Sequence, residues 1–139
     1  MLHPFPRPPQ FALRVRKSSV GLGVFAEQDI PKNRFLLEYW GDLMTDDDAQ
    51  EIGGRYLFEL GNGKTIEGST RENTARYINH SCKPNSEVRI VGNRVFIFSI
   101  KPIKTGEELS YDYGKEYFDY YIKPHGCRCP PCKKKQGAK

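Results

Sequence analysis

The spacing of the four cysteines is the feature of this chain that most directly suggests chemistry. Cys127, Cys129 and Cys132 lie within six positions of one another, and the fourth is Cys82. Cys127 and Cys129 are too close in sequence to pair easily with each other, and nothing in the sequence marks a secreted protein. Tightly spaced cysteines in such a chain are typical of a metal site. The sequence therefore predicts metal binding around residues 127–132.

A glycine pair near the N-terminus suggests a second kind of chemistry. The segment from Gly21 to Ala26 fits the pattern G-x-G-x-x-A of dinucleotide-binding proteins, and an acid, Glu38, follows downstream. That fingerprint needs a helix opening within it. Residues 27–33 are too few for a crossover helix and include Pro31. The pattern therefore favours a glycine turn between two strands over a nicotinamide site.

Three blocks of sequence occur in a fixed order. Residues 76–85 read RYINHSCKPN, residues 106–114 read GEELSYDYG, and residues 127–132 read CRCPPC. In this order and with these gaps they resemble the SET-domain family of protein lysine methyltransferases, in the form with a cysteine-bearing post-SET tail. The resemblance covers residues 14–132. It implies transfer of a methyl group from S-adenosylmethionine to the ε-amine of a lysine in a protein substrate.

The resemblance also implies roles for three tyrosines. Tyr113 matches the essential tyrosine whose hydroxyl orients the methyl group and the amine. Tyr111 occupies the family's phenylalanine/tyrosine switch position, where a hydroxyl leaves less room for a methylated lysine, so monomethylation is the expected outcome. Tyr39 aligns with a tyrosine that lines the lysine channel, although a buried strand aromatic would give the same pattern.

A cofactor wall is implied by the same resemblance. It comprises the turn with Gly21, Leu22 and Gly23, the residues Arg76, Tyr77, Asn79 and His80, and a tail aromatic, Tyr117 or Phe118, stacked on the adenine. Packing of a short helix over residues 117–122 is the alternative for those two rings. In the family, the segment of Tyr111 and Tyr113 threads beneath the loop 79–85, and this pseudoknot joins the cofactor and lysine sites.

Zinc is the metal that the resemblance implies. Relatives bind a tetrahedral Zn²⁺ through one cysteine of the Asn-His-Ser-Cys loop and three of the tail, which here are Cys82, Cys127, Cys129 and Cys132. Such a closed Cys₄ shell is structural, because no position remains open for substrate. The tail spacing is C-x-C-x₂-C here, whereas C-x-C-x₄-C is usual. A local alternative replaces Cys82 with His125.

Many short strands joined by Gly and Asn turns surround these motifs. Strands are predicted over residues 14–17, 23–26, 34–40, 55–60, 64–67, 87–91 and 94–100, and a helix over 46–52 begins after Thr45. The predicted fold class is mainly β, a SET-domain (β-clip-like) fold of several short sheets with a C-terminal pseudoknot and a zinc-bound tail. The predicted division is an extended Pro-rich lead-in over 1–11, a SET domain over 12–114, and a post-SET zinc segment with basic tail over 115–139.

The charge and composition of the chain indicate which kinds of partner it could bind. The chain has 139 residues and a net charge of +5, and it contains no run of 18 apolar residues, so no membrane span is expected. Acidic side chains gather between Asp42 and Tyr56, where they fit either a basic, histone-like substrate or a well-capped helix start. The basic tail 133–139 suits a solvated end or a weak nucleic-acid contact.

The expected partners indicate a cellular location, and alternative functions are considered beside the methyltransferase. An intracellular protein is expected, in the nucleus on chromatin if the host is eukaryotic or receives the protein, and otherwise in the cytoplasm. The alternatives are a methyltransferase of non-histone proteins, or a non-catalytic SET-like module that binds peptides. A nucleic-acid-binding zinc module would need a base-reading helix, and no such helix pattern is present.

Overall fold

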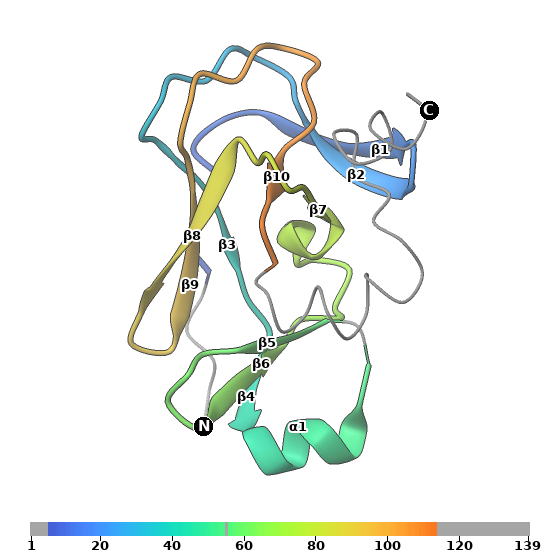
Figure 1. The fold of residues 1–139 in the computed structure, drawn as a ribbon, viewed down its shortest axis with the longest axis vertical. Helices are drawn as coiled ribbons and strands as arrows, with labels where there is room; N and C mark the ends of the chain where they lie inside the picture. The colour runs from blue at the N-terminus through green and yellow to red at the C-terminus, as the bar shows by residue number, and fades with distance from the viewer. Residues whose placement is uncertain (1–5, 55, 114–139) are drawn as a thin grey trace.

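Small β-sheets contain most of the regular secondary structure of the described residues, as Figure 1 shows. This computed structural model describes residues 6–54 and 56–113. The strands and helices are β1 (Leu13–Ser18), β2 (Gly21–Ala26), β3 (Phe35–Tyr39), β4 (Asp42–Thr45), α1 (Asp46–Ile52), β5 (Leu57–Glu59), β6 (Lys64–Glu67), the 3₁₀ helix η1 (Thr74–Tyr77), β7 (Asn79–His80), β8 (Ser86–Val91), β9 (Arg94–Ser99) and β10 (Ser110–Tyr111). The helix predicted over 117–122 lies outside the described residues.

Four sheets are formed by these strands. Strands β1 and β2 pair alone, and two three-stranded sheets have the orders β3-β9-β8 and β4-β6-β5. All of these pairings are antiparallel, whereas β7 and β10 pair in parallel. The prediction of a mainly β fold built from several short sheets is confirmed.

Local turn chemistry explains which elements the sequence predicts well. The two-residue connection between β8 and β9 is Gly92-Asn93, and Gly92 has a φ of 61° there. Helix α1 spans the predicted residues, and its cap is Thr45, whose Oγ1 accepts a hydrogen bond from Asp48 N at 3.2 Å. None of the helices in the described part of the chain is long and apolar enough to cross a membrane.

Strand β9 shows how the core is built from alternation. Val95, Ile97 and Ser99 are buried, and the residues between them are less so. Opposite β9, strand β3 is buried at every position. Its Glu38 carboxylate is satisfied by the Arg94 guanidinium, at 2.7 and 3.0 Å, and by Arg7 N at 2.7 Å. The second half of the Pro-rich lead-in is therefore held against β3.

Candidate functional site

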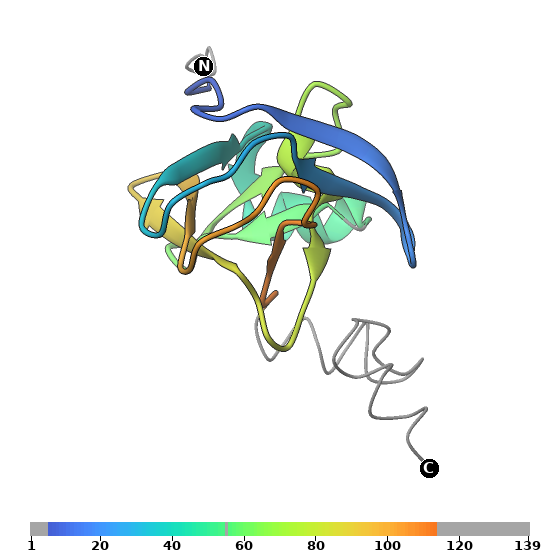
Figure 2. The ribbon, with the colours of Figure 1, turned by 90° about the horizontal axis from the view of Figure 1, so that it is seen from above.

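The parallel pair β7–β10 brings two of the sequence blocks into contact. Asn79 is opposite Ser110 and His80 is opposite Tyr111. Beyond the pair, Ser81 N donates to Tyr111 O at 3.2 Å. Seen from above, the loop from β7 to β8 passes around β10 (Figure 2). The threaded arrangement implied by the resemblance is thus present in the described residues.

Asn85 closes this loop around the strand. Its Nδ2 donates to Glu108 O at 2.8 Å, and its Oδ1 accepts from Ser110 N at 2.9 Å. On the other side of the same segment, Leu109 N donates to Val24 O at 2.7 Å. The backbone of residues 108–110 is therefore held both by the loop and by β2.

The glycine pair lies at the start of β2, next to β7. Gly21 has a φ of 110°, a conformation that side-chain-bearing residues rarely adopt. Leu22 O accepts a hydrogen bond from Asn79 Nδ2 at 2.9 Å, and the Leu22 side chain remains 47% exposed. Residues 21–26 form a strand, so the helix that a dinucleotide fingerprint requires is missing here.

A glycine is required at position 23 because the structure leaves no room for a Cβ atom there, and not because of an unusual φ. A Cβ at this position would lie 2.3 Å from Glu108 Oε2 and 3.2 Å from Asn79 Nδ2. The resemblance places Gly23 in the cofactor wall, and in the structure the space beside it is filled by the Glu108 carboxylate. The sequence motifs give no role for Glu108. Its hydrogen-bond partner Asn79 lies 29 residues away in sequence.

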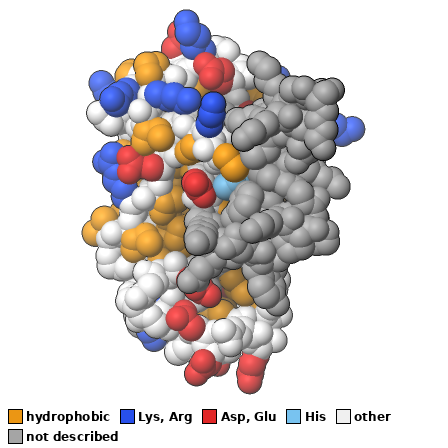
Figure 3. Space-filling model, in the orientation of Figure 1, with side chains coloured by type: hydrophobic (Ala, Val, Ile, Leu, Met, Phe, Trp, Pro, Cys, Tyr) orange, Lys and Arg blue, Asp and Glu red, His pale blue; other side chains and the backbone are white. Residues whose placement is uncertain are grey.

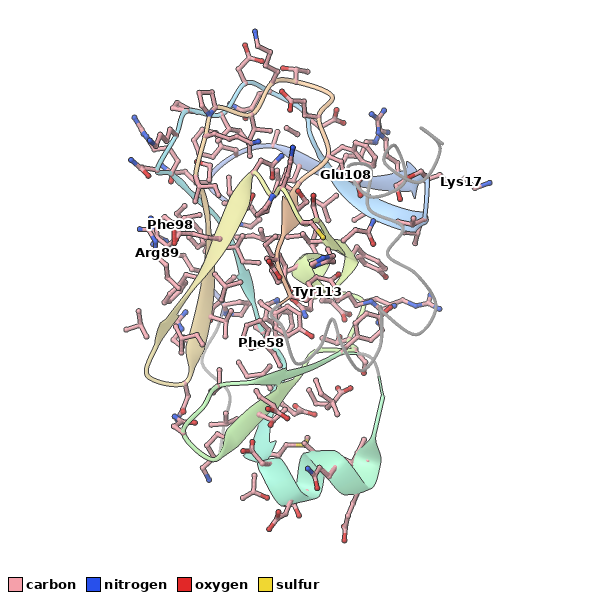
Figure 4. The ribbon with its side chains drawn as sticks, in the orientation of Figure 1. Lys17, Phe58, Arg89, Phe98, Glu108 and Tyr113 are labelled. Atoms are coloured by element: carbon pink, nitrogen blue, oxygen red, sulfur yellow. The ribbon has the colours of Figure 1, made fainter. Side chains whose placement is uncertain are left out.

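The two tyrosines of the block 106–114, Tyr111 and Tyr113, pack beside β7, and Figure 4 labels Tyr113. The ring centroids of Tyr111 and Tyr113 are 5.0 Å apart, and those of His80 and Tyr113 are 5.4 Å apart. The Tyr113 hydroxyl donates to Ile78 O. Tyr111 is only 6% exposed. Both tyrosines thus have fixed positions at the edge of the hydrophobic core.

Tyr39 is part of the same core, on strand β3. It is 4% exposed, its hydroxyl donates to Tyr56 O at 2.8 Å, and its ring lies 5.3 Å from that of Phe58. Tyr56 and Phe58 were not singled out from the sequence. The only local signal for these two residues is their aromatic character within the predicted strand 55–60. Their contact with Tyr39 depends on tertiary packing.

His80 is buried, and its imidazole is held by the block 106–114. Nδ1 accepts a hydrogen bond from Tyr113 N at 3.1 Å. Burial lowers the pKa of His80, and the Asp112 carboxylate, 3.8 Å from Nδ1, opposes that shift. A neutral imidazole that accepts at Nδ1 carries its hydrogen on Nε2, which lies 3.5 Å from Cys82 Sγ.

Arg76 and Tyr77 come from η1, directly before β7. The Arg76 guanidinium lies 4.6 Å from the ring centroids of both Tyr56 and Tyr77, and it also donates to Ser69 O. Its Nε is buried and has no hydrogen-bond partner within the described ranges. A buried cationic donor without a partner is suited to an anionic group of a ligand.

The predicted metal site is only partly covered by the structure. Cys82 is exposed, near the start of the loop that leads from β7 to β8. Within residues 6–54 and 56–113, no three potential ligands come together. The other predicted ligands and ring partners lie outside the described residues, namely Cys127, Cys129, Cys132, the alternative His125, Tyr117 and Phe118.

Comparisons with known proteins agree with this architecture. The sequence pattern of the SET domain matches residues 21–114. Among solved structures, a humanized mutant of the Chaetomium thermophilum Polycomb Repressive Complex 2, bound to the inhibitor GSK126, is similar with a TM-score of 0.68 and 34% sequence identity. The match covers 75% of this chain and 15% of that chain.

Several curated relatives are similar over most of this chain. The histone-lysine N-methyltransferase trr of Drosophila melanogaster is 35% identical over 86% of the chain, and EHMT1 of Homo sapiens is 36% identical over 88%. The putative histone-lysine N-methyltransferase ASHH4 of Arabidopsis thaliana is 34% identical over 90%. The chain spans 5%, 11% and 39% of the lengths of these three relatives, respectively.

Proposed function

The chain belongs to the SET-domain family, and from this membership we propose that it is a protein-lysine N-methyltransferase that uses S-adenosylmethionine. The observation that carries the proposal is the parallel pairing of β7 with β10. That pairing brings the Asn-His motif next to the two tyrosines of the block 106–114, Tyr111 within β10 and Tyr113 directly after it. The names of the relatives support the same reaction class.

The proposed cofactor wall is built from the glycine turn, η1 and β7. Its members are Gly21, Leu22, Gly23, Arg76, Tyr77, Asn79 and His80. The donor set fits the ligand, because Arg76 offers to a carboxylate a cationic group whose buried Nε has no hydrogen-bond partner among the described residues. The half-exposed Leu22 offers apolar surface beside Asn79. S-adenosylmethionine supplies an electrophilic methyl group on a positive sulfonium.

Lysine methylation requires a neutral amine, and the aromatic residues supply the environment for it. A free lysine has a pKa of about 10.4, so its neutral form costs roughly 4–5 kcal/mol at neutral pH. A narrow apolar channel lowers that cost by desolvating the ammonium. We assign this role to Tyr39, Tyr111 and Tyr113, which belong to one hydrophobic cluster.

Tyr113 is the proposed catalytic residue. Its hydroxyl hydrogen is donated to Ile78 O. A phenol oxygen in this state can still accept a hydrogen bond from an amine. Such an acceptor orients the amine's lone pair towards the methyl group, and holding the two reactants in line replaces a bimolecular encounter. Tyr111 beside it, with its own hydroxyl, favours a monomethylated product.

The proposed substrate is a lysine in a histone or another basic chromatin protein, which makes the nucleus the proposed location. Acidic side chains along β4 and α1 would attract such a substrate, and the relatives named above are histone-lysine methyltransferases. A weak nucleic-acid contact through residues 133–139 remains part of the proposal, although these residues lie outside the described ranges.

Zinc is proposed as a structural ion. Cys82 would hold it together with Cys127, Cys129 and Cys132, and the exposure of the Cys82 thiol fits that role. Such an ion would fasten residues beyond 113 to the loop that follows β7, next to the cofactor wall. It would take no part in methyl transfer, since a Cys₄ shell leaves no open position.

Calorimetry tests the cofactor assignment directly. The purified chain is expected to bind S-adenosylmethionine, and Asn79→Ala is expected to weaken that binding by about tenfold, the cost of one hydrogen bond to a charged group. NAD is the control ligand, because the glycine pair formally fits a dinucleotide pattern. Binding of NAD without binding of S-adenosylmethionine would contradict the proposal.

A further inference from the structure

Glu108 stands beside the cofactor wall without an assigned role, and its carboxylate contacts members of that wall. Glu108 Oε2 accepts a hydrogen bond from Asn79 Nδ2 at 2.7 Å. The same nitrogen lies 2.9 Å from Leu22 O and 3.3 Å from Ser18 Oγ. A carboxylate and a carbonyl can only accept hydrogen bonds, and a hydroxyl can accept one. Nδ2 is therefore surrounded by acceptors.

These acceptors determine which way the Asn79 amide points. In the reversed orientation, the amide oxygen would face the Glu108 carboxylate and the Leu22 carbonyl with no hydrogen between them, which is repulsive. With Nδ2 on this side, Oδ1 is turned away from Glu108. No donor among residues 6–54 and 56–113 hydrogen-bonds to that oxygen. Oδ1 is therefore available to accept a hydrogen bond from a ligand.

The carboxylate is itself fixed by its surroundings. The Glu108 backbone forms a bridge with Phe25 of β2, and its carbonyl accepts from Asn85 Nδ2 at 2.8 Å. Its side chain lies against Gly23, where a Cβ would come within 2.3 Å of Oε2. The second glycine of the pair thus makes room for Glu108, whose label in Figure 4 lies beside β2.

We infer that Glu108 is a positioning residue for the cofactor site: it holds the Asn79 amide so that Oδ1 faces the ammonium of the cofactor's amino acid portion. An ammonium has only donors, so it needs an acceptor at this place, and an amide NH₂ would repel it. The inference rests on the proposed function, because S-adenosylmethionine is the ligand that Oδ1 meets. It adds a residue that acts on the cofactor through Asn79.

The first test compares two substitutions of Glu108 in the full chain by calorimetry with S-adenosylmethionine. Glu108→Ala is expected to weaken binding about tenfold, because the amide loses its orienting acceptor. Glu108→Gln keeps an oxygen that can accept from Asn79 Nδ2, so it is expected to retain most of the affinity. The matched control is Glu107→Gln, an exposed neighbour, which is expected to bind like the wild type. Equal losses in Glu108→Ala and Glu108→Gln would overturn the inference.

A double-substitution cycle tests whether Glu108 acts through Asn79. If it does, adding Glu108→Ala to Asn79→Ala weakens binding little further, because the oriented group is already gone. Full additivity of the two losses would contradict that route. Melting temperatures of all variants accompany the cycle. Unchanged affinity with a lowered melting temperature in Glu108→Ala would show a role in stability alone.

Two further measurements separate this inference from the proposed function. The side-chain NH₂ resonance of Asn79, followed by nitrogen–proton NMR without any ligand, is expected to shift in Glu108→Ala and not in Glu107→Gln. An unmoved resonance would overturn the inference. Gly23→Ala is expected to weaken cofactor binding, because the added Cβ would displace the Glu108 carboxylate, and unchanged binding by this variant would contradict the inference. Wild-type protein that fails to bind the cofactor removes the proposed function and this inference with it, whereas wild-type binding equalled by Glu108→Ala removes only the inference.

Discussion

Tyr111 and Tyr113 lie side by side, yet their surroundings differ in a way that suits different tasks. Tyr113 donates its hydroxyl hydrogen to a main-chain carbonyl, whereas Tyr111 is almost completely buried beside it, with ring centroids 5.0 Å apart. A hydroxyl in such a confined place takes up room that a larger amine would need. Under the proposed function, the number of methyl groups transferred is therefore expected to depend on Tyr111.

Replacing Tyr111 tests whether its hydroxyl limits the number of methyl groups transferred. In Tyr111→Phe the hydroxyl is lost and the ring is kept, so the balance of products is expected to shift from monomethyl to dimethyl and trimethyl lysine. Mass spectrometry of a peptide substrate measures the shift, and a peptide that is already monomethylated serves as the matched substrate. Mainly trimethyl product from the wild-type chain would contradict the assignment of Tyr111.

Motif residues and their supporting residues were not equally predictable from the sequence. Asn79, His80 and Tyr113 belong to blocks that stand out by their order and spacing, and the structure brings all three together. Glu108 is part of such a block, but its importance depends on Asn79 and Gly23, from which it is separated by 29 and 85 residues, respectively. Contacts of this kind follow from the threaded topology, which no local pattern encodes.

At the scale of elements, the hairpins and α1 were predictable, and β7 and β10 were not. The β8–β9 hairpin and α1 carry their own turn and cap signals. Strands β7 and β10 have two residues each and exist because they pair with one another. Such short strands have no alternation to detect, and their pairing depends on tertiary contacts.

The Glu38–Arg94 pair joins β3 to β9 and offers a prediction about stability. Arg94→Met leaves the buried Glu38 carboxylate with the Arg7 N–H as its remaining partner among the described residues, and the free energy of unfolding is expected to fall by about 2 kcal/mol. That value lies below the cost for a fully buried pair because Arg94 reaches solvent. The matched control is Arg89→Met, whose pair with Glu87 is exposed. Equal stability of the two variants would contradict the account.

The whole molecule has an uneven distribution of charge. Residues 42–67 contain seven acidic and two basic side chains, although the net charge of the chain is +5. On the face drawn in Figure 3, acidic side chains lie at the end of the molecule where α1 lies, and the Lys and Arg side chains in view lie mostly towards the other end, where acidic side chains are interspersed with them. A basic substrate would therefore be attracted to one end of the molecule.

Neutralising part of this acidic end tests its contribution. The double variant Asp47→Asn, Glu51→Gln leaves the Thr45 cap and the Asp46–Thr65 hydrogen bond intact. It is expected to raise KM for a basic peptide several-fold at low salt with little change in kcat, and the difference is expected to shrink above about 0.1 M salt. An unchanged KM at low salt would favour the simpler reading, in which these acids only start the helix.

The proposed zinc ion would join the loop after β7, which carries Cys82, to the residues beyond 113. Cys82→Ser is expected to lower bound zinc measured by metal analysis, because one of four ligands is lost, and to weaken cofactor binding if the ion fastens the tail beside the site. His125→Ala is the matched variant and is expected to keep its zinc. Full retention of zinc by Cys82→Ser would favour His125 as the fourth ligand.

The most direct test of the whole account is incorporation of labelled methyl from S-adenosylmethionine into mixed core histones, with Tyr113→Phe measured in parallel. The account predicts incorporation by the wild-type chain and a loss of about a hundredfold or more in Tyr113→Phe, while calorimetry shows that the variant still binds the cofactor. Equal incorporation by both proteins would contradict the catalytic site at β7 and β10. No incorporation by a wild-type chain that binds the cofactor would contradict the histone substrate.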